Sequence, residues 1–154
     1  MVALQPITAA NWAAVLALRV TAAQEQFVTD VAGSMAEAAD EPGGRAIQWA
    51  LCVGETPVGF VMISDDVAAP GYFPQYLWKL LIDHRHQRQG YGTAALDLVA
   101  DYFRGSGEAT VMRTSAGEGD GSPIPFYERY GFVRTGDIVF DDEVLLQYRL
   151  RDGA

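Results

Sequence analysis

The sequence QRQGYGT, residues 87–93, joins two segments of opposite character. Tyr76–Ile82, before it, is an almost continuous apolar run, which is typical of a central strand buried on both faces. Thr93–Arg104, after it, has apolar side chains on one helical face, acidic and basic side chains on the other, and Gly105 at its end. The stretch therefore predicts a buried strand, a glycine-containing turn and an amphipathic helix.

Such a turn is suited to binding an anion. Gly90 and Gly92 allow a tight turn and a close approach of the backbone to a ligand. The first N–H groups of the following helix have no partner inside the helix, so they can hold a pyrophosphate. The chain has neither a Gly-x-Gly-x-x-Gly nor a Gly-Lys-Ser/Thr loop, which disfavours dinucleotide and nucleoside triphosphate binding. An ordinary strand-to-helix turn is the alternative.

The neighbouring residues carry a family resemblance. Leu80–Ile82 followed by Gln87–Thr93 resembles the acetyl-coenzyme A (acetyl-CoA) motif of the Gcn5-related N-acetyltransferase (GNAT) superfamily. Phe126–Phe132 is similar to the late helix of that superfamily, in which a tyrosine faces the thioester sulfur. The resemblance implies an α/β fold with a central, mostly antiparallel sheet whose middle strands splay apart and whose faces carry helices. The chain looks closest to the bacterial spermine/spermidine or diamine acetyltransferase-like group.

Outward from this centre, periodicity and turn residues predict a single domain over residues 1–154. We expect helices over 11–20, 34–39 and 123–130, and strands over 47–53, 58–63, 109–113, 132–135 and 139–150. The strands 47–53 and 58–63 are expected to form a hairpin with a four-residue turn over 54–57, and 117–121 a loop.

Composition limits the classes of partner. The 154 residues carry a formal net charge of −9, which opposes binding to nucleic acid or to anionic lipid and favours a cationic partner. Cys52 is the only cysteine, so an intramolecular disulfide is excluded and a reducing compartment fits. No secretion signal or membrane span is apparent, so a cytoplasmic location is expected. No metal site is predicted, because His84 and His86 have no further ligands near them in the sequence.

The resemblance implies a set of cofactor-binding residues. They are Leu80, Leu81, Ile82, Gln87, Arg88, Gln89, Gly90, Tyr91, Gly92, Thr93, Ser122 and Tyr127. Backbone groups of Leu80, Leu81 and Ile82 are expected to pair with the pantetheine arm like an added strand, and the N–H of Ile82 to stabilise the oxyanion. Many family members have an asparagine where this chain has Asp120, so we expect Ser122 to supply the missing hydrogen bond.

The resemblance also implies catalytic roles. Tyr127 is the candidate acid, since a phenol is protonated at neutral pH and can donate to the departing thiolate. The base is open, because related polyamine enzymes have a glutamate where this chain has Trp78; water or Glu25 are the alternatives. Trp78 is expected to wall the amine pocket, and Phe27, Tyr72 and Phe73 either line the acceptor site or belong to the core.

These observations predict an acetyl-CoA-dependent N-acetyltransferase that acts by direct attack on the thioester. The expected acceptor is a primary amine of a small molecule, either a polyamine or diamine or an amine-bearing antibiotic. A protein or peptide acetyltransferase and a non-catalytic acyl-CoA sensor are the alternatives. By the same resemblance, we expect a homodimer formed through the strands over 132–150.

Overall fold

The computed structural model describes residues 1–40, 46–65, 74–105 and 109–151. Seven strands and four α-helices follow one another in the described parts. Their order is β1 (Val2–Gln5), α1 (Trp12–Leu16), α2 (Val31–Asp40), β2 (Ala46–Val53), β3 (Thr56–Ser64), β4 (Tyr76–Ile82), α3 (Tyr91–Arg104), β5 (Val111–Ala116), α4 (Ile124–Tyr130), β6 (Val133–Val139) and β7 (Glu143–Arg149). Short 3-10 helices over Ala22–Gln24 and His84–His86 lie in two of the connections.

The strands form one seven-stranded sheet in the order β1-β2-β3-β4-β5-β7-β6. All neighbouring strands are antiparallel except β4 and β5, which are parallel. The strand expected at the centre, β4, is indeed the middle one, and the mixed α/β class is confirmed.

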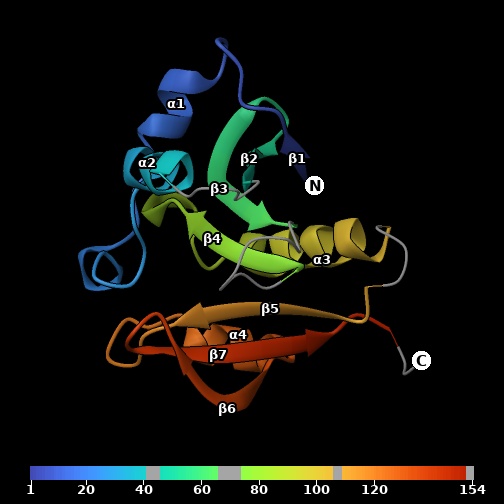
Figure 1. Ribbon diagram of the computed structural model, residues 1–154. Helices are drawn as coiled ribbons and strands as arrows, with labels where there is room; N and C mark the ends of the chain where they lie inside the picture. Colours follow the sequence, from blue (N-terminus) through green and yellow to red (C-terminus); the bar gives the residue numbers. More distant parts are fainter. Residues whose placement is uncertain (41–45, 66–73, 106–108, 152–154) are drawn as a thin grey trace.

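The sheet opens between its two middle strands. In the described residues, β4 and β5 share one residue pair, Tyr76 with Arg113, whereas β3 and β4 remain paired as far as Ile82. Figure 1 shows β4 and β5 diverging from this point. The expected splay is thus present, and the edge of β4 that faces β5 is open along most of its length.

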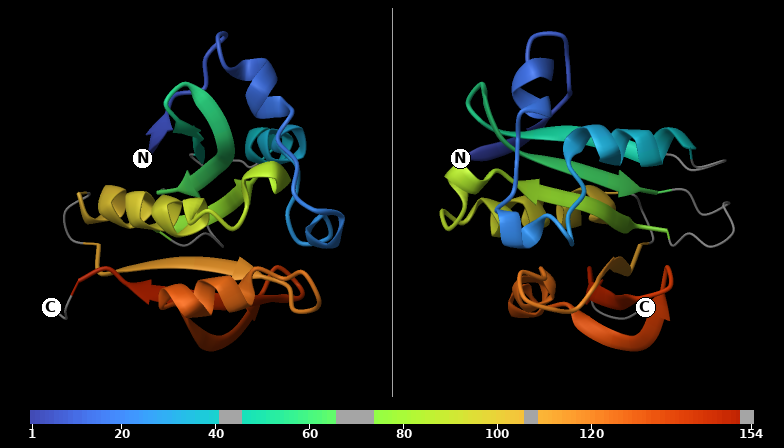
Figure 2. Two further views of the ribbon diagram at one scale, coloured as in Figure 1. Left: turned by 180° about the vertical axis from the view of Figure 1, so that it is seen from behind. Right: turned by 90° about the vertical axis from the view of Figure 1, so that its left-hand side faces the viewer.

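Each face of the sheet is covered by its own helices. Residues alternate across a strand, so Phe60 and Met62 of β3 pack with Val15 and Val31 of α1 and α2, while Val61 and Ile63 face the opposite way. The second face packs against the buried stripe of α3 and against α4; the stripe consists of Ala95, Leu96, Val99, Ala100 and Phe103. Figure 2 shows α3 and α4 on the face opposite α1 and α2. Two cores therefore hold the open sheet from both sides.

A bulge in β4 changes which side chains share a face. Lys79 pairs with Met62 and Leu77 with Ile63, so Trp78 is the extra residue that shifts the register with β3. Such a bulge lets neighbouring side chains of one strand point to the same side. Trp78, Lys79 and Leu80 are only half-buried as a result, whereas the apolar run predicted burial of the whole strand on both faces.

Several predicted boundaries are wrong. The hairpin turn has two residues, Gly54 and Glu55, because Gly54 adopts a φ of 58° and Val53 already pairs with Thr56. The first helix ends at Leu16, and β1 was not predicted because four residues are too few to show a period. The predicted strand over 109–113 lies two residues later, as Val111–Ala116. Residues 41–45, directly after α2, lie outside the described part of the chain.

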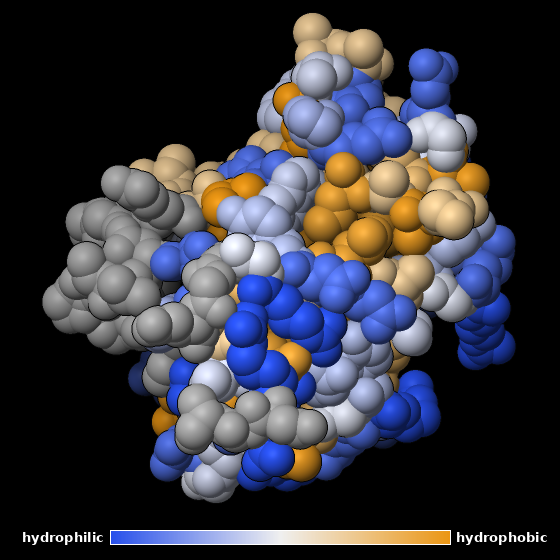
Figure 3. All heavy atoms as spheres, turned by 90° about the vertical axis from the view of Figure 1, so that its right-hand side faces the viewer, coloured by the Kyte–Doolittle hydropathy of each residue, from blue (hydrophilic) through white to orange (hydrophobic). Residues whose placement is uncertain are grey.

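The surface is mixed in character. On the face drawn in Figure 3, hydrophilic residues cover much of the area and hydrophobic ones gather in one part of it. No helix among the described residues combines the length and apolar character that crossing a membrane requires.

Candidate active site

The QRQGYGT loop has the backbone geometry of an anion cradle. Gly90 takes a φ of 82° immediately before α3, a conformation that favours glycine, and Arg88 is also left-handed at 64°. The helical hydrogen bond of this turn runs from the Ala94 amide to the Gly90 carbonyl at 3.0 Å. The amides of Tyr91, Gly92 and Thr93 come before that bond, so they point out of the helix end. Gly90 and Arg88 are exposed, which leaves this end accessible.

The glycine at 92 brings the two recognised motifs together. A Cβ on Gly92 would lie 3.0 Å from the Phe126 ring of α4, closer than side chains normally pack. The absence of a side chain thus lets α4 approach the start of α3. This approach sets Tyr127 beside the opening between β4 and β5.

The open edge of β4 presents alternate backbone groups. The Asp83 amide donates to the Val58 carbonyl of β3 at 2.9 Å, and successive residues of a strand turn their backbone groups to opposite sides. Leu81 therefore faces β3, while Leu80 and Ile82 face the opening. The close approach of a Cβ on Gly59 to the Leu81 oxygen, 2.5 Å, agrees with this assignment. The open edge of β4 therefore presents the backbone groups of Leu80 and Ile82, and those of Leu81 are turned toward β3.

The side chain of Gln87 holds the end of β4. Its Nε2 donates to the Ile82 carbonyl at 2.9 Å and to Oε1 of Gln24 at 2.8 Å. Gln24 ends the short 3-10 helix that precedes the pocket segment 25–29. The side chain predicted to bind the cofactor therefore fixes the Ile82–Asp83 peptide and joins it to that segment.

A buried carboxylate stabilises the same corner. Asp83 accepts from the Arg19 amide at 3.0 Å and from the Arg85 side chain at 2.8 Å. Burial raises the pKa of Asp83, but these hydrogen bonds and the guanidinium charge outweigh burial and hold the pKa at about 2. Asp83 is thus ionised at neutral pH and ties the segment after α1 to the loop that follows β4.

Tyr127 lies at the opening with its hydroxyl protonated. The side chain is buried, and burial raises its pKa to about 12 although a hydrogen bond with Thr114 works against the rise. The Thr114 hydroxyl donates to the Leu77 carbonyl of β4 at 2.9 Å. Tyr127 is therefore protonated at neutral pH and has a proton to donate. Thr114, a residue of β5, links that strand to β4.

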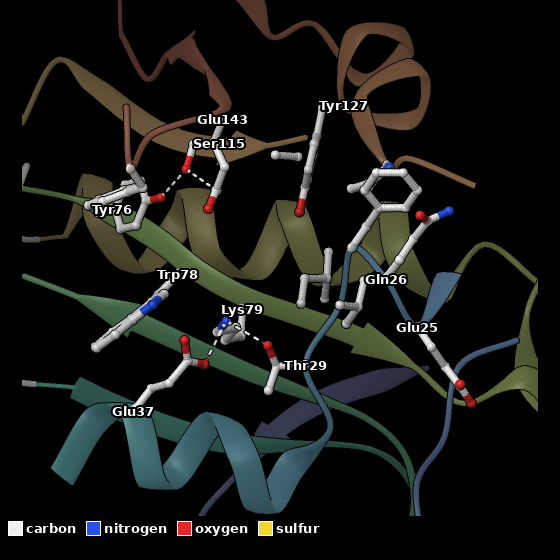
Figure 4. A pocket seen from close by; sticks show the side chains of 16 residues that line it. Glu25, Gln26, Thr29, Glu37, Tyr76, Trp78, Lys79, Ser115, Tyr127 and Glu143 are labelled. Carbon is white, nitrogen blue, oxygen red and sulfur yellow. Dashed lines mark hydrogen bonds and ion pairs between the residues drawn. The ribbon is translucent and has the colours of Figure 1, made fainter. Parts of the chain in front are cut away.

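A pocket of about 360 Å³ lies beside Tyr127 in the opening of the sheet. Figure 4 shows side chains entering it from β4, from the segment before α2, from α2 and from the β5–β7 wall. Its lining consists of Glu25, Gln26, Phe27, Val28, Thr29, Glu37, Tyr76, Trp78, Lys79, Leu80, Ser115, Ala116, Pro123, Tyr127, Phe140 and Glu143. The structure thus brings the predicted substrate residues Glu25, Phe27 and Trp78 together with Leu80 and Tyr127. Tyr72 and Phe73 lie outside the described residues.

The pocket is acidic and aromatic. In the described part of the chain, three carboxylates and one ammonium line it, from Glu25, Glu37, Glu143 and Lys79. Lys79 is paired with Glu37 at 2.9 Å and donates to Thr29 at 3.2 Å. The excess of negative charge favours a cationic ligand, and the aromatic walls suit such a ligand as well.

Sequence reasoning gave no role in this pocket to several polar residues, among them Tyr76, Lys79 and Ser115. Tyr76, Ser115 and Glu143 form one hydrogen-bonded network, in which Ser115 Oγ lies 2.8 Å from Glu143 Oε1. Lys79 lies next to the bulge of β4, and its side chain lines the pocket. The three strands that supply the network are far apart in the sequence, and the one available signal was a charged or hydroxyl residue inside an otherwise apolar strand.

Ser122 forms hydrogen bonds within its own loop, and its contact with the cofactor stays a prediction. Its hydroxyl donates to the Gly117 carbonyl at 2.6 Å and accepts from the Ile124 amide at 3.2 Å. The same loop packs tightly on the preceding segment, since a Cβ on Gly121 would lie 2.3 Å from the Ala23 oxygen. Ser122 therefore closes the loop before α4, whose N-cap is Pro123.

Comparison with known proteins agrees with the geometry. The family model described as acetyltransferase (GNAT) family matches residues 12–132. Coenzyme A-bound aminoglycoside acetyltransferase AAC(6′)-Ib is a similar structure, with a TM-score of 0.73 and 17% identity over 97% of this chain and 95% of that chain. The GNAT domain of PAT from S. lividans has a TM-score of 0.70 and 14% identity over 95% and 89% of the two chains.

A third similar structure acts on a protein. It is an alanine N-acetyltransferase of a ribosomal protein from Escherichia coli, with a TM-score of 0.65 and 14% identity over 100% of this chain and 97% of that chain. At these identities the structures establish the shared fold. No curated protein matches the sequence.

Proposed function

The chain belongs to the acetyltransferase (GNAT) family, and from that premise we propose that it transfers the acetyl group of acetyl-CoA to the amine of a small molecule. The acceptor class that we favour is a polyamine or diamine, with an amine-bearing antibiotic as the second possibility. The observation that carries this proposal is the acidic, aromatic pocket beside Tyr127, in which carboxylates outnumber the ammonium. A dication or polycation is attracted to such a pocket, whereas an anionic acceptor is repelled.

Residues of the chain fit acetyl-CoA as the acyl donor, which supplies the acetyl group as a thioester. The amides of Tyr91, Gly92 and Thr93 at the start of α3 would hold its pyrophosphate, with Arg88 adding positive charge beside them. Gln89 is exposed in the same loop. The backbone of Leu80 and Ile82 would pair with the pantetheine arm along the open edge of β4.

The remaining roles follow from position. The N–H of Ile82 points to the opening and would stabilise the oxyanion, a contribution of about 3 kcal/mol for one such donor. Tyr127 would protonate the departing sulfur. Because its pKa of about 12 lies well above that of a thiol, this transfer must be concerted with the return of a proton from the new amide nitrogen.

The position of the single cysteine favours direct attack of the amine on the thioester. Cys52, the single cysteine of the chain, is buried in β2 and is not part of the pocket lining. A mechanism through an acylated cysteine would require this side chain to reach the cofactor. We therefore propose a ternary complex in which amine and acetyl-CoA are bound together.

The proposal also covers the oligomeric state and the cellular location of the protein. β6 is an edge strand whose residues from Val133 to Ile138 are all exposed, so a second copy pairing there would cover apolar surface. We propose a homodimer of this kind in the cytoplasm, to be tested by sedimentation of the wild type and a Val133→Lys variant. A monomeric wild type contradicts it.

An acceptor panel tests the proposed activity. Purified protein is incubated with acetyl-CoA and spermidine, putrescine, an aminoglycoside or short peptides, and thiol release is followed for each. We expect turnover with one class of small cationic amine. Faster turnover with peptides supports a protein acetyltransferase, and tight acetyl-CoA binding without turnover on any acceptor supports an acyl-CoA sensor.

A further inference from the structure

On the basis of the proposed function, we propose that Glu143 is the catalytic residue that accepts the proton of the acceptor amine. The reaction needs such a group, because an amine is mostly an ammonium at neutral pH and an ammonium has no lone pair for attack. β4 carries Trp78 rather than an acidic residue at the centre of the opening. The group must therefore come from another wall of the pocket.

Glu143 is held in one orientation by a directional chain of hydroxyls. Ser115 donates its single proton to Oε1 of Glu143 at 2.8 Å, so the hydrogen bond between Ser115 and Tyr76 must be donated by Tyr76. Tyr76 is 4% exposed, and burial raises the pKa of its hydroxyl, so it remains a donor. In this series of hydrogen bonds, from Tyr76 to Ser115 to Glu143, the carboxylate is the last acceptor.

The carboxylate also faces the reacting region. Glu143 begins β7 next to the pair that joins Val144 to Ala116 of β5, and Tyr127 of α4 lines the same pocket. Figure 4 shows Glu143 and Tyr127 pointing into the pocket toward β4. An amine bound between β4 and these two side chains would have the proton acceptor Glu143 on one side. On the other side it would have Tyr127, the proposed proton donor to the departing sulfur.

The turn before Glu143 sets an aromatic side chain beside the carboxylate. Phe140 and Asp141 adopt φ values of 49° and 73°, which bulky residues rarely take. The Phe140 ring lies 6.3 Å from the Tyr76 ring and lines the pocket next to Glu143. The hairpin turn thus places the Phe140 ring in the pocket wall beside the carboxylate.

The other ionisable groups that face the pocket fit the role less well. Glu37 of α2 is paired with Lys79 of β4, so its charge is already balanced. Glu25 is exposed, and in Figure 4 it lies at the far end of the pocket from Glu143. Tyr127 is protonated and is assigned to the sulfur.

The proposed step balances in atoms and charge. Glu143 takes one proton from the ammonium, and the freed lone pair forms the C–N bond to the thioester carbon. As the C–S bond breaks, the sulfur receives the proton of Tyr127, and the new amide nitrogen returns its second proton to Tyr127. The products are the N-acetylated amine and the free thiol of coenzyme A, and the proton on Glu143 passes to solvent.

Three near-isosteric variants test this assignment. Glu143→Gln keeps the shape and the hydrogen bond from Ser115 but cannot accept a proton, and Asp142→Asn removes one charge from the adjacent exposed position. kcat and KM for the amine are measured from about pH 6 to about pH 9, together with acetyl-CoA affinity and the melting temperature. Glu25→Gln is measured alongside as the competing base.

We expect Glu143→Gln to lower kcat/KM by at least about a hundredfold at neutral pH, with acetyl-CoA affinity unchanged. Its deficit should shrink about tenfold per pH unit toward the pKa of the amine, because the variant depends on free amine. Asp142→Asn should keep the wild-type profile. The assignment would be overturned if Glu143→Gln showed a pH profile parallel to that of the wild type, or a rise in KM alone. It would also be overturned if the pH-dependent deficit appeared in Glu25→Gln instead. If the wild type turns over no amine, the proposed function fails first, and this role fails with it.

Discussion

Asp83 gives a prediction whose size follows from the structure. The carboxylate is 1% exposed and accepts hydrogen bonds from Arg19 and Arg85, and its pKa falls from an ordinary 3.8 to about 2. Each pKa unit corresponds to about 1.4 kcal/mol, so ionised Asp83 stabilises the fold by roughly 2 kcal/mol at neutral pH. Asp83→Asn should lower the free energy of unfolding by about this amount.

The sign of the pH dependence follows from the lowered pKa. The stabilising contribution is fully present above the unfolded pKa of about 3.8 and is lost as the pH falls through the folded pKa of about 2. The difference between wild type and Asp83→Asn should therefore shrink from about pH 4 downward. Above that range the difference should be constant.

Urea unfolding followed by tryptophan fluorescence measures both quantities. Asp137→Asn, at an exposed position of β6, is the control for loss of one carboxylate and should change stability by less than about 0.5 kcal/mol. A loss below about 0.5 kcal/mol for Asp83→Asn at neutral pH, or a loss that stays the same down to about pH 2, would refute the reasoning.

Three further substitutions test the site. Tyr127→Phe should lower kcat at least about tenfold without changing acetyl-CoA affinity, and a variant whose kcat stays within about twofold of the wild type would show that Tyr127 is not the acid. Gly59→Ala should lower the free energy of unfolding in urea by about 1–3 kcal/mol, because its Cβ would lie 2.5 Å from a β4 oxygen. Gly105→Ala is the control, and its loss should be smaller because the nearest atom to its Cβ would be 3.4 Å away. Equal losses in the two variants would contradict the packing. Gln87→Ala should lower kcat several-fold with little change in KM for acetyl-CoA, since it holds the carbonyl of Ile82, and a rise in KM alone would mean direct cofactor binding.

The central strand, turn and helix were predictable because their signals are local. The apolar run of β4, the glycines at 90 and 92 and the amphipathic pattern of α3 lie within one stretch of chain, and the structure has the strand at its predicted bounds. The helix starts at Tyr91, two residues before the prediction, because Gly90 is already its N-cap. Backbone conformation at one glycine decided that boundary.

The pocket was predictable only in part, because its geometry is non-local. Trp78 was expected to be a pocket wall and lies in the lining, but the bulge that turns Lys79 to the same side depends on the register with β3. The approach of Ser115 and Glu143 to β4 depends on the splay of the sheet and on the pairing of β5 with β7. Neither relation leaves a periodic signal in the sequence.

Roles of individual side chains were harder to predict than positions. Gln87 and Ser122 lie next to the predicted cofactor path, but their side chains bond to Ile82 and Gly117 of the chain itself. A motif identifies where a loop goes and leaves open which atom of each residue meets the ligand. Backbone amides remain the donors that this loop offers to the cofactor.

Transfer of a labelled acetyl group tests the central claim most directly. The protein is incubated with isotopically labelled acetyl-CoA and the best amine of the panel, and acetylated amine, free thiol and label on the protein are quantified by mass spectrometry. The account predicts one labelled acetyl group on the amine for each thiol released, with no label retained on the protein. Thiol release without acetylated amine, or label bound to the protein during turnover, would contradict direct acetyl transfer in this pocket.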